Sequence, residues 1–203
     1  LLNSLVGQIN DILWSYVLII LLIGAGIIFT IRTKFVQIRF IKEMIRLIAG
    51  DAGNKMEGQQ ISSFQAFCVS TASRVGVGNI AGIAIAVVLG GPGAIFWMWI
   101  IAILGSATGF VESTLAQIYK VPRTDSNGYL GGPAYYINNA LHSPKTAVFF
   151  AILISITYGL IFNSVQSNTI SLSLQTAFNF DATMIGIVIA VFSGIVVFGG
   201  LHR

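Results

Sequence analysis

The stretch that decides the fold reads Ser70-Thr71-Ala72-Ser73-Arg74-Val75-Gly76-Val77-Gly78-Asn79-Ile80-Ala81-Gly82. It lies in an apolar region, residues 63–89, that is long enough to cross a bilayer, for which about 20 residues are needed. Gly76 and Gly78 flank a single residue, and each glycine weakens a helix by about 1 kcal/mol relative to alanine. We therefore expect a membrane helix that is interrupted near its middle.

An interruption at this depth is tolerated only where protein or a polar cavity covers the exposed backbone groups. The amides at the start of the outer half-helix suit a carboxylate, and the carbonyls at the end of the inner half-helix suit Na⁺ or an ammonium group. The alternative is that the glycines allow close packing between helices. A dinucleotide fingerprint is excluded, because the glycine spacing is wrong and no strand precedes it.

Composition places the whole chain in the membrane. Of its 203 residues, 55% are hydrophobic and 9% are charged, whereas soluble domains carry about 25% charged residues. Cys68 is the only cysteine and there are two histidines. The chain therefore cannot form an internal disulfide and has very few residues for a cysteine- or histidine-based metal site. A soluble enzyme, a zinc protein and a nucleic-acid binder are poor interpretations, and the spans carry no nucleophile–base pair for an intramembrane enzyme.

The apolar runs predict an all-α protein with five transmembrane helices. These helices are expected over residues 12–31, 63–89, 94–119, 146–180 and 182–201. If the spans alternate in direction, ten of the eleven lysines and arginines fall on one side. Basic loops stay in the cytoplasm, which predicts an N-terminus outside the cell.

Residues 34–48 carry charges on one helical face, at Arg39, Lys42, Glu43 and Arg46, and apolar residues on the other. This pattern predicts a basic amphipathic helix at the cytoplasmic interface. It is either a connector on the membrane surface or a partner-binding helix.

Arg74 and Glu112 are the only charges expected inside spans. Such charges usually pair or face a cavity, because a lone charge at mid-bilayer is costly. An Arg74–Glu112 ion pair near an inner gate is one hypothesis. A pair that only fixes helix packing is another, and proton coupling through Glu112 is a third.

The fourth span is unusually polar around Gln166. A neutral amide donates and accepts hydrogen bonds together, so Gln166 suits a zwitterionic amino acid whose charges are met by helix ends. Hydrogen bonding between helices is the alternative role.

Four motifs resemble those of the alanine or glycine:cation symporter family, also called the sodium:alanine symporters. They are Val75-Gly76-Val77-Gly78-Asn79-Ile80-Ala81-Gly82, Gly90-Gly91-Pro92-Gly93-Ala94-Ile95-Phe96-Trp97-Met98-Trp99, Gly131-Gly132-Pro133-Ala134-Tyr135-Tyr136-Ile137 and Asn163-Ser164-Val165-Gln166-Ser167-Asn168. The resemblance implies Na⁺-coupled uptake of alanine or glycine across the cytoplasmic membrane, with Na⁺ as coupling ion and no other cofactor. A proton-coupled permease and a non-transporting membrane subunit are the alternatives.

The resemblance also implies a leucine-transporter-type fold, in which an extra first helix is followed by two inverted repeats of five helices. Residues 1–203 correspond to the extra helix and most of the first repeat, as a single transmembrane unit. We therefore expect the chain to be a fragment or a truncated product, whose partners include the lipid bilayer and the remaining helices of the full-length transporter.

Site residues are expected around the broken helix. The substrate-binding residues are Gly76, Val77, Gly78 and Gln166. The sodium ligands are the backbone carbonyls of Ala72, Arg74 and Val75 and the side chain of Asn79. The amides of Val77 and Gly78 are expected to point at the substrate carboxylate.

Overall fold

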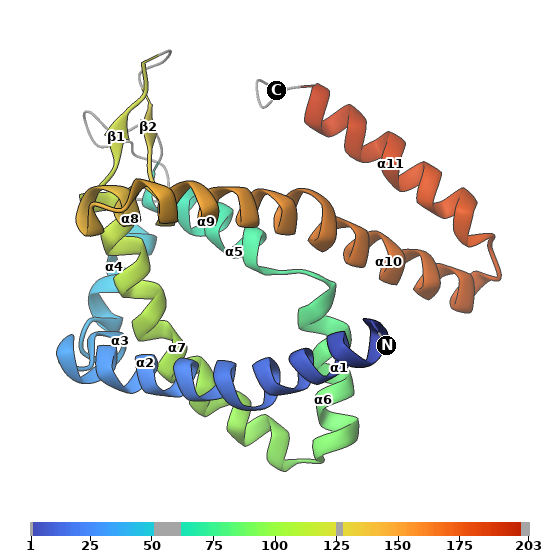
Figure 1. Cartoon of the computed structure of the whole chain (residues 1–203), viewed down its shortest axis with the longest axis horizontal. Coiled ribbons are helices and arrows are strands. Elements are labelled where there is room, and N and C mark those ends of the chain that lie inside the picture. The colour runs from blue at the N-terminus through green and yellow to red at the C-terminus, as the bar shows by residue number, and fades with distance from the viewer. Residues whose placement is uncertain (1, 51–61, 125–127, 200–203) are drawn as a thin grey trace.

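The computed structural model describes residues 2–50, 62–124 and 128–199, and this part of the chain is helical apart from one short hairpin (Figure 1). Its first helix is continuous through α1 (Leu2–Ile12), the π-helix η1 (Leu13–Val17) and α2 (Leu18–Arg32). The uncharged residues 12–31 fill most of this helix, which is long and apolar enough to cross a membrane.

The segment after α2 differs from the single helix expected over residues 34–48. The structure has two helices there, α3 (Val36–Arg39) and α4 (Ile41–Gly50). Lys34 and Phe35 take positive φ angles of 54° and 55°, which turns the chain so that Val36, only 2% exposed, becomes buried where α3 packs on α7. Helical periodicity in the sequence does not reveal a turn that tertiary packing imposes. The position of this segment at the cytoplasmic interface stays a prediction.

The second span begins at a capped helix end. The Ser62 side chain accepts a hydrogen bond from the Gln65 amide at 3.2 Å, and the Gln65 side chain accepts from the Ser62 amide at 3.0 Å, which is a capping box. The span then comprises α5 (Ser63–Arg74), the π-helix η2 (Gly78–Gly82) and α6 (Ile83–Gly90). Gly91, at φ 63°, makes the turn into α7 (Gly93–Ile118), a conformation that glycine adopts without strain.

The second half of the described chain continues from α7 through the antiparallel hairpin β1 (Val121–Pro122) and β2 (Tyr129–Leu130). The helices that follow are α8 (Pro133–Leu141), α9 (Pro144–Ile156), the π-helix η3 (Thr157–Phe162), α10 (Asn163–Phe178) and α11 (Ala182–Phe198). Figure 1 shows α9 and α10 as one long rod and α11 turning back beside the end of α10.

Three helices of the described residues are long and apolar enough to cross a membrane, and the bent pair α5 with η2–α6 adds a fourth if it counts as one span. α11 is apolar but has 17 residues, and the count of five spans stays a prediction.

Helix crossings hold most of the buried residues in the described part of the chain. At the crossing of α2 and α7, Ala107 is fully buried and Thr30 is 5% exposed. Gly26 lies against Leu104 so closely that a Cβ atom at Gly26 would be 2.9 Å from the Leu104 Cβ. Most other large apolar side chains are exposed, as expected for surfaces that face lipid or further protein.

Candidate functional site

The helix interruption predicted from the Gly76–Gly78 stretch is present. α5 ends at Arg74, and Val75 takes an extended conformation, with φ −89° and ψ 119°. The helix resumes in a new direction, bent by 65° from the first half (Figure 1). The chain between Arg74 and Gly78 thus leaves the regular hydrogen-bonding pattern of a helix within an apolar span.

Asn79, in η2, closes the break from the side of α6. Its side-chain Oδ1 accepts a hydrogen bond from the Gly76 amide at 3.2 Å, and its own amide donates to the Gly76 carbonyl at 3.0 Å. Because an amide oxygen has two lone pairs, Oδ1 keeps one that is free for a further donor or a cation.

Gln166 reaches the break from α10, 89 positions along the chain. The Val77 amide donates to Gln166 Oε1 at 2.9 Å. A Cβ atom at Gly76 would lie 2.5 Å from Gln166 Nε2, so a side chain at position 76 would displace the end of the Gln166 side chain. The structure therefore brings Gly76, Val77 and Gln166 together, as expected for residues of one site. The sequence predicted a Val77 amide that is free to bind the substrate carboxylate, whereas in the structure this amide donates to Gln166.

The remaining expected site residues lie around the same break. Ala72 and Arg74 are in the last turn of α5, where carbonyls lack helical partners, and Val75 follows directly. Gly78 opens η2, and a Cβ atom there would meet nothing within 4 Å. The free space beside Gly78 leaves room for a small ligand to approach the backbone.

Arg74 and Glu112 face the same cavity without forming the expected ion pair. The cavity has a volume of about 850 Å³ and lies between α3, α4, α5 and α7. Arg74 Nη1 donates to Ser70 Oγ, one turn back on α5. Within the described residues, the ion pair within 4 Å is instead Arg46–Glu43 on α4, at 2.6 Å.

The charge of Glu112 also affects a residue of α8, Tyr136. Burial raises the pKa of the Tyr136 phenol, and the Glu112 carboxylate raises it further. Both causes favour the neutral phenol. Tyr136 belongs to the Gly131–Ile137 motif, so this motif lies within electrostatic range of the carboxylate in α7.

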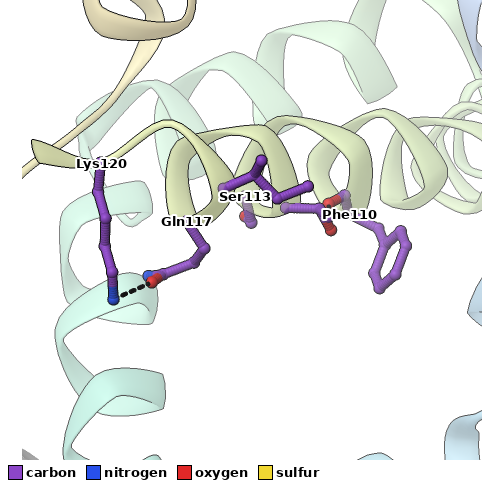
Figure 2. Close-up of a pocket in the computed structure, with 6 residues that line it drawn as sticks. Phe110, Ser113, Gln117 and Lys120 are labelled. Atoms are coloured by element: carbon purple, nitrogen blue, oxygen red, sulfur yellow. Dashed lines mark hydrogen bonds between the residues drawn. The ribbon is translucent and has the colours of Figure 1, made fainter.

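A smaller cavity of about 470 Å³ follows the C-terminal half of α7 (Figure 2). It is lined by Phe110, Ser113, Thr114, Gln117, Ile118 and Lys120. Lys120 Nζ donates to Gln117 Oε1 at 3.1 Å and lies over the Tyr129 ring, 4.5 Å from its centroid. No residue of the broken helix lines it, so we do not assign it to substrate.

The larger cavity, of about 850 Å³, is also lined by Gln37 and by two small hydroxyl residues of α7, Ser106 and Thr108, which the sequence did not predict. Gln37 lies between apolar residues in the segment 34–48. An uncharged polar residue at such a position is the feature of the sequence that could have indicated a cavity-lining role.

Comparison with known proteins identifies the family of this chain. The sodium:alanine symporter family matches residues 1–203. The chain is 54% identical to the probable sodium/glutamine symporter GlnT of Bacillus subtilis, with 100% of the chain matching 42% of that protein. It is 50% identical to the amino-acid carrier protein AlsT of the same organism, with 99% of the chain matching 42% of AlsT.

A more distant relative is the sodium/alanine symporter AgcS of Methanococcus maripaludis, which is 37% identical over 98% of the chain and 44% of AgcS. The chain thus spans about two fifths of the length of these relatives. Because the family matches from the first residue to the last, the chain belongs to the sodium:alanine symporter family.

Proposed function

We propose that this chain forms part of a transporter that carries a small neutral amino acid, alanine or glycine, into the cell together with Na⁺. Membership of a family of sodium symporters supports the proposal, as do relatives named for sodium-coupled carriage of glutamine and of alanine. Since the chain spans about two fifths of these relatives, it works with further helices. This chain and those helices together form the full-length transporter.

The observation that carries the proposal is the link between the broken span and Gln166. The Val77 amide, exposed by the break, is held by Gln166 Oε1 at 2.9 Å. A substrate carboxylate is a stronger acceptor than a neutral amide oxygen. Substrate therefore displaces Gln166 from the Val77 amide, and Gln166 then hydrogen-bonds the bound amino acid. The positive end of the outer half-helix favours the carboxylate in the same place.

Na⁺ is proposed to bind beside the carboxylate, among oxygen atoms of the break. The ligands are the free lone pair of Asn79 Oδ1 and the carbonyls of Ala72, Arg74 and Val75 at the end of α5. A hard cation prefers such oxygens, and the negative end of the inner half-helix adds to the attraction. Because their charges are opposite, the ion and the carboxylate stabilise each other's binding.

The protein is a multi-pass membrane protein. We place it in the cytoplasmic membrane with its N-terminus outside, because this arrangement leaves ten of the eleven basic residues on the cytoplasmic side.

Uptake by the full-length transporter in proteoliposomes tests the proposal. An inward Na⁺ gradient is expected to drive accumulation of labelled alanine or glycine. Glutamine is tested in parallel, because one relative is named as a probable sodium/glutamine symporter. Uptake that depends on an imposed pH gradient and not on Na⁺ would contradict Na⁺ coupling. Absence of uptake of all three amino acids under either gradient would contradict the transport function.

A further inference from the structure

The cavity between α3, α4, α5 and α7 has no side-chain role in the proposed transport site. Its volume is about 850 Å³. It lies between the break at residues 75–77 and the connector formed by α3 and α4, with Val36, Gln37 and Met44 on the connector side. In the proposed orientation this connector is cytoplasmic, so the cavity lies on the path from the break to the cell interior.

Two opposite charges line this cavity and do not neutralise each other directly. No nitrogen of Arg74 lies within 4 Å of a Glu112 oxygen. Arg74 uses one donor on Ser70 Oγ and has five N–H groups. Among the described residues, Glu112 has no hydrogen-bond or ion-pair partner. The two side chains are exposed and present opposite charges to the same cavity, so a ligand that carries both charges can pair with each of them.

The uncharged groups of the cavity are mainly acceptors. Gln37 Nε2 donates to Thr30 Oγ1 at 3.1 Å, whereas Gln37 Oε1 is buried without a partner. The hydroxyls of Ser106 and Thr108 donate to the carbonyls of Ile103 and Gly105, at 2.6 and 2.7 Å, and so offer only lone pairs to the cavity. The lone pairs of these hydroxyls and the Glu112 carboxylate, which line the same cavity, suit the three donors of an ammonium group.

We propose that this cavity is a second binding site for the zwitterionic amino acid, occupied on its way out to the cytoplasm. Glu112 binds the ammonium group, and Arg74 binds the carboxylate. The inference rests on the proposed function, since it assigns an exit site to the same substrate. A lone cation or a lone anion fits less well, because each leaves one of the two charged side chains unpaired.

Binding without Na⁺ distinguishes this site from the one at the break. The full-length transporter in nanodiscs is titrated with labelled alanine in Na⁺-free buffer and again with Na⁺. The Gly78→Val variant removes the approach to the break and is sterically tolerated, because a Cβ atom there meets nothing within 4 Å. Weak, Na⁺-independent alanine binding is expected in both proteins. The variant is also expected to lose the additional binding that Na⁺ produces in the parent protein. Absence of that Na⁺-dependent binding in the parent protein would contradict the proposed function, whereas absence of the Na⁺-independent binding in both proteins would overturn the exit site.

A second measurement, which needs no further variant, tests whether the site recognises both charges of alanine. Ethylamine and propionate, each carrying one of the two charges of alanine, are used as competitors in the Na⁺-free titration. Each is expected to compete at least about tenfold more weakly than alanine, which corresponds to about 1.4 kcal/mol. Equal competition by either compound would overturn recognition of a zwitterion.

The variants Glu112→Gln and Arg74→Gln then assign the site to the cavity. Each is expected to weaken Na⁺-independent binding about tenfold, and the matched control Arg46→Gln, whose side chain pairs with Glu43 outside the cavity, is expected to leave it unchanged. Unchanged binding in both cavity variants would overturn the proposal, because the pair would then act only as a gate or in packing. The competition measurement decides the matter if a variant does not fold.

Discussion

At the scale of single residues, the site depends on how closely Gln166 approaches Gly76. Gln166 Nε2 occupies the space that any side chain at position 76 would need, and Gln166 Oε1 holds the Val77 amide. A buried amide without a partner costs about 1–3 kcal/mol. Gln166 therefore supports the broken backbone in the absence of substrate and is proposed to bind the substrate when it arrives.

We predict that Gln166→Leu weakens alanine uptake by the full-length transporter with little loss of folded yield. The leucine cannot hydrogen-bond the substrate, while the cost of the unpartnered Val77 amide, about 1–3 kcal/mol, is a modest part of total stability. Uptake rate and monodisperse yield are measured together. Gln166→Glu, which keeps an acceptor for the amide, is the matched control for the backbone role. Normal uptake with a collapsed yield for Gln166→Leu would assign the residue to packing.

Asn79→Ala is predicted to raise the Na⁺ concentration needed for half-maximal uptake and also to weaken alanine binding, because coupling between two ligands is reciprocal. The substitution removes the oxygen that accepts from the Gly76 amide at 3.2 Å and is proposed to bind Na⁺. Alanine binding is measured across a Na⁺ titration, with Asn79→Asp as the variant that retains an oxygen. An unchanged Na⁺ dependence in Asn79→Ala would exclude this residue from the ion site.

At the scale of secondary-structure elements, the crossing of α2 and α7 and the cap of α5 position the two halves of the broken span. α7 packs on both α2 and α6, so the second half of the broken span rests against a helix that also packs on α2. The first half, α5, starts from the capping box at Ser62 and packs on α4.

Gly26→Ala is predicted to destabilise the α2–α7 crossing. The new Cβ atom would lie 2.9 Å from the Leu104 Cβ and 3.3 Å from its carbonyl oxygen, so the two helices must separate, at a cost of about 1–3 kcal/mol. Thermal unfolding of the full-length transporter in detergent measures the loss. Gly24→Ala is the control, since a Cβ atom there meets nothing within 4 Å. Equal unfolding temperatures for both variants would show that the crossing tolerates the methyl group.

Ser62→Ala is predicted to cost about 1 kcal/mol, because it removes the side chain that accepts from the Gln65 amide. The comparison variant is Ser73→Ala, which loses only an exposed hydroxyl bonded to the Ser70 carbonyl inside α5. The unfolding temperature of the full-length transporter should fall for Ser62→Ala and stay near the parent value for Ser73→Ala. The opposite order would mean that the cap does not stabilise α5.

At the scale of the whole molecule, the described chain buries few side chains away from the helix crossings. Apolar surfaces of this extent need lipid or other helices against them. This agrees with a chain that spans about two fifths of its relatives and supports the proposal that the site is completed by further helices. The distribution of basic residues predicts the orientation of the assembly in the membrane.

The distribution of basic residues predicts that residues 32–60 lie in the cytoplasm and Asp181 outside the cell. Single cysteines introduced at Asn54 and at Asp181, in a Cys68→Ser background, are labelled with a membrane-impermeant maleimide on intact cells and on inverted vesicles. Asp181→Cys should react on cells and Asn54→Cys only on vesicles. Reaction of both on intact cells would contradict the orientation.

Local sequence was sufficient to predict the helical membrane fold, the family, and the interruption after Arg74, since each depends on composition or on residues close together in the chain. A glycine on either side of one residue weakens a helix wherever that helix is placed. The same reasoning identified Gln166 as a polar residue of unusual position in an apolar span.

Only the tertiary structure decided which groups meet. The Val77 amide is bonded to Gln166 from 89 positions away, Arg74 turns to Ser70 instead of pairing with Glu112, and α3 separates from α4 so that Val36 becomes buried. These outcomes depend on the angle and distance at which separate helices cross. Such geometry is set by side-chain packing across the crossings, whereas helical periodicity describes only which faces of one helix are apolar.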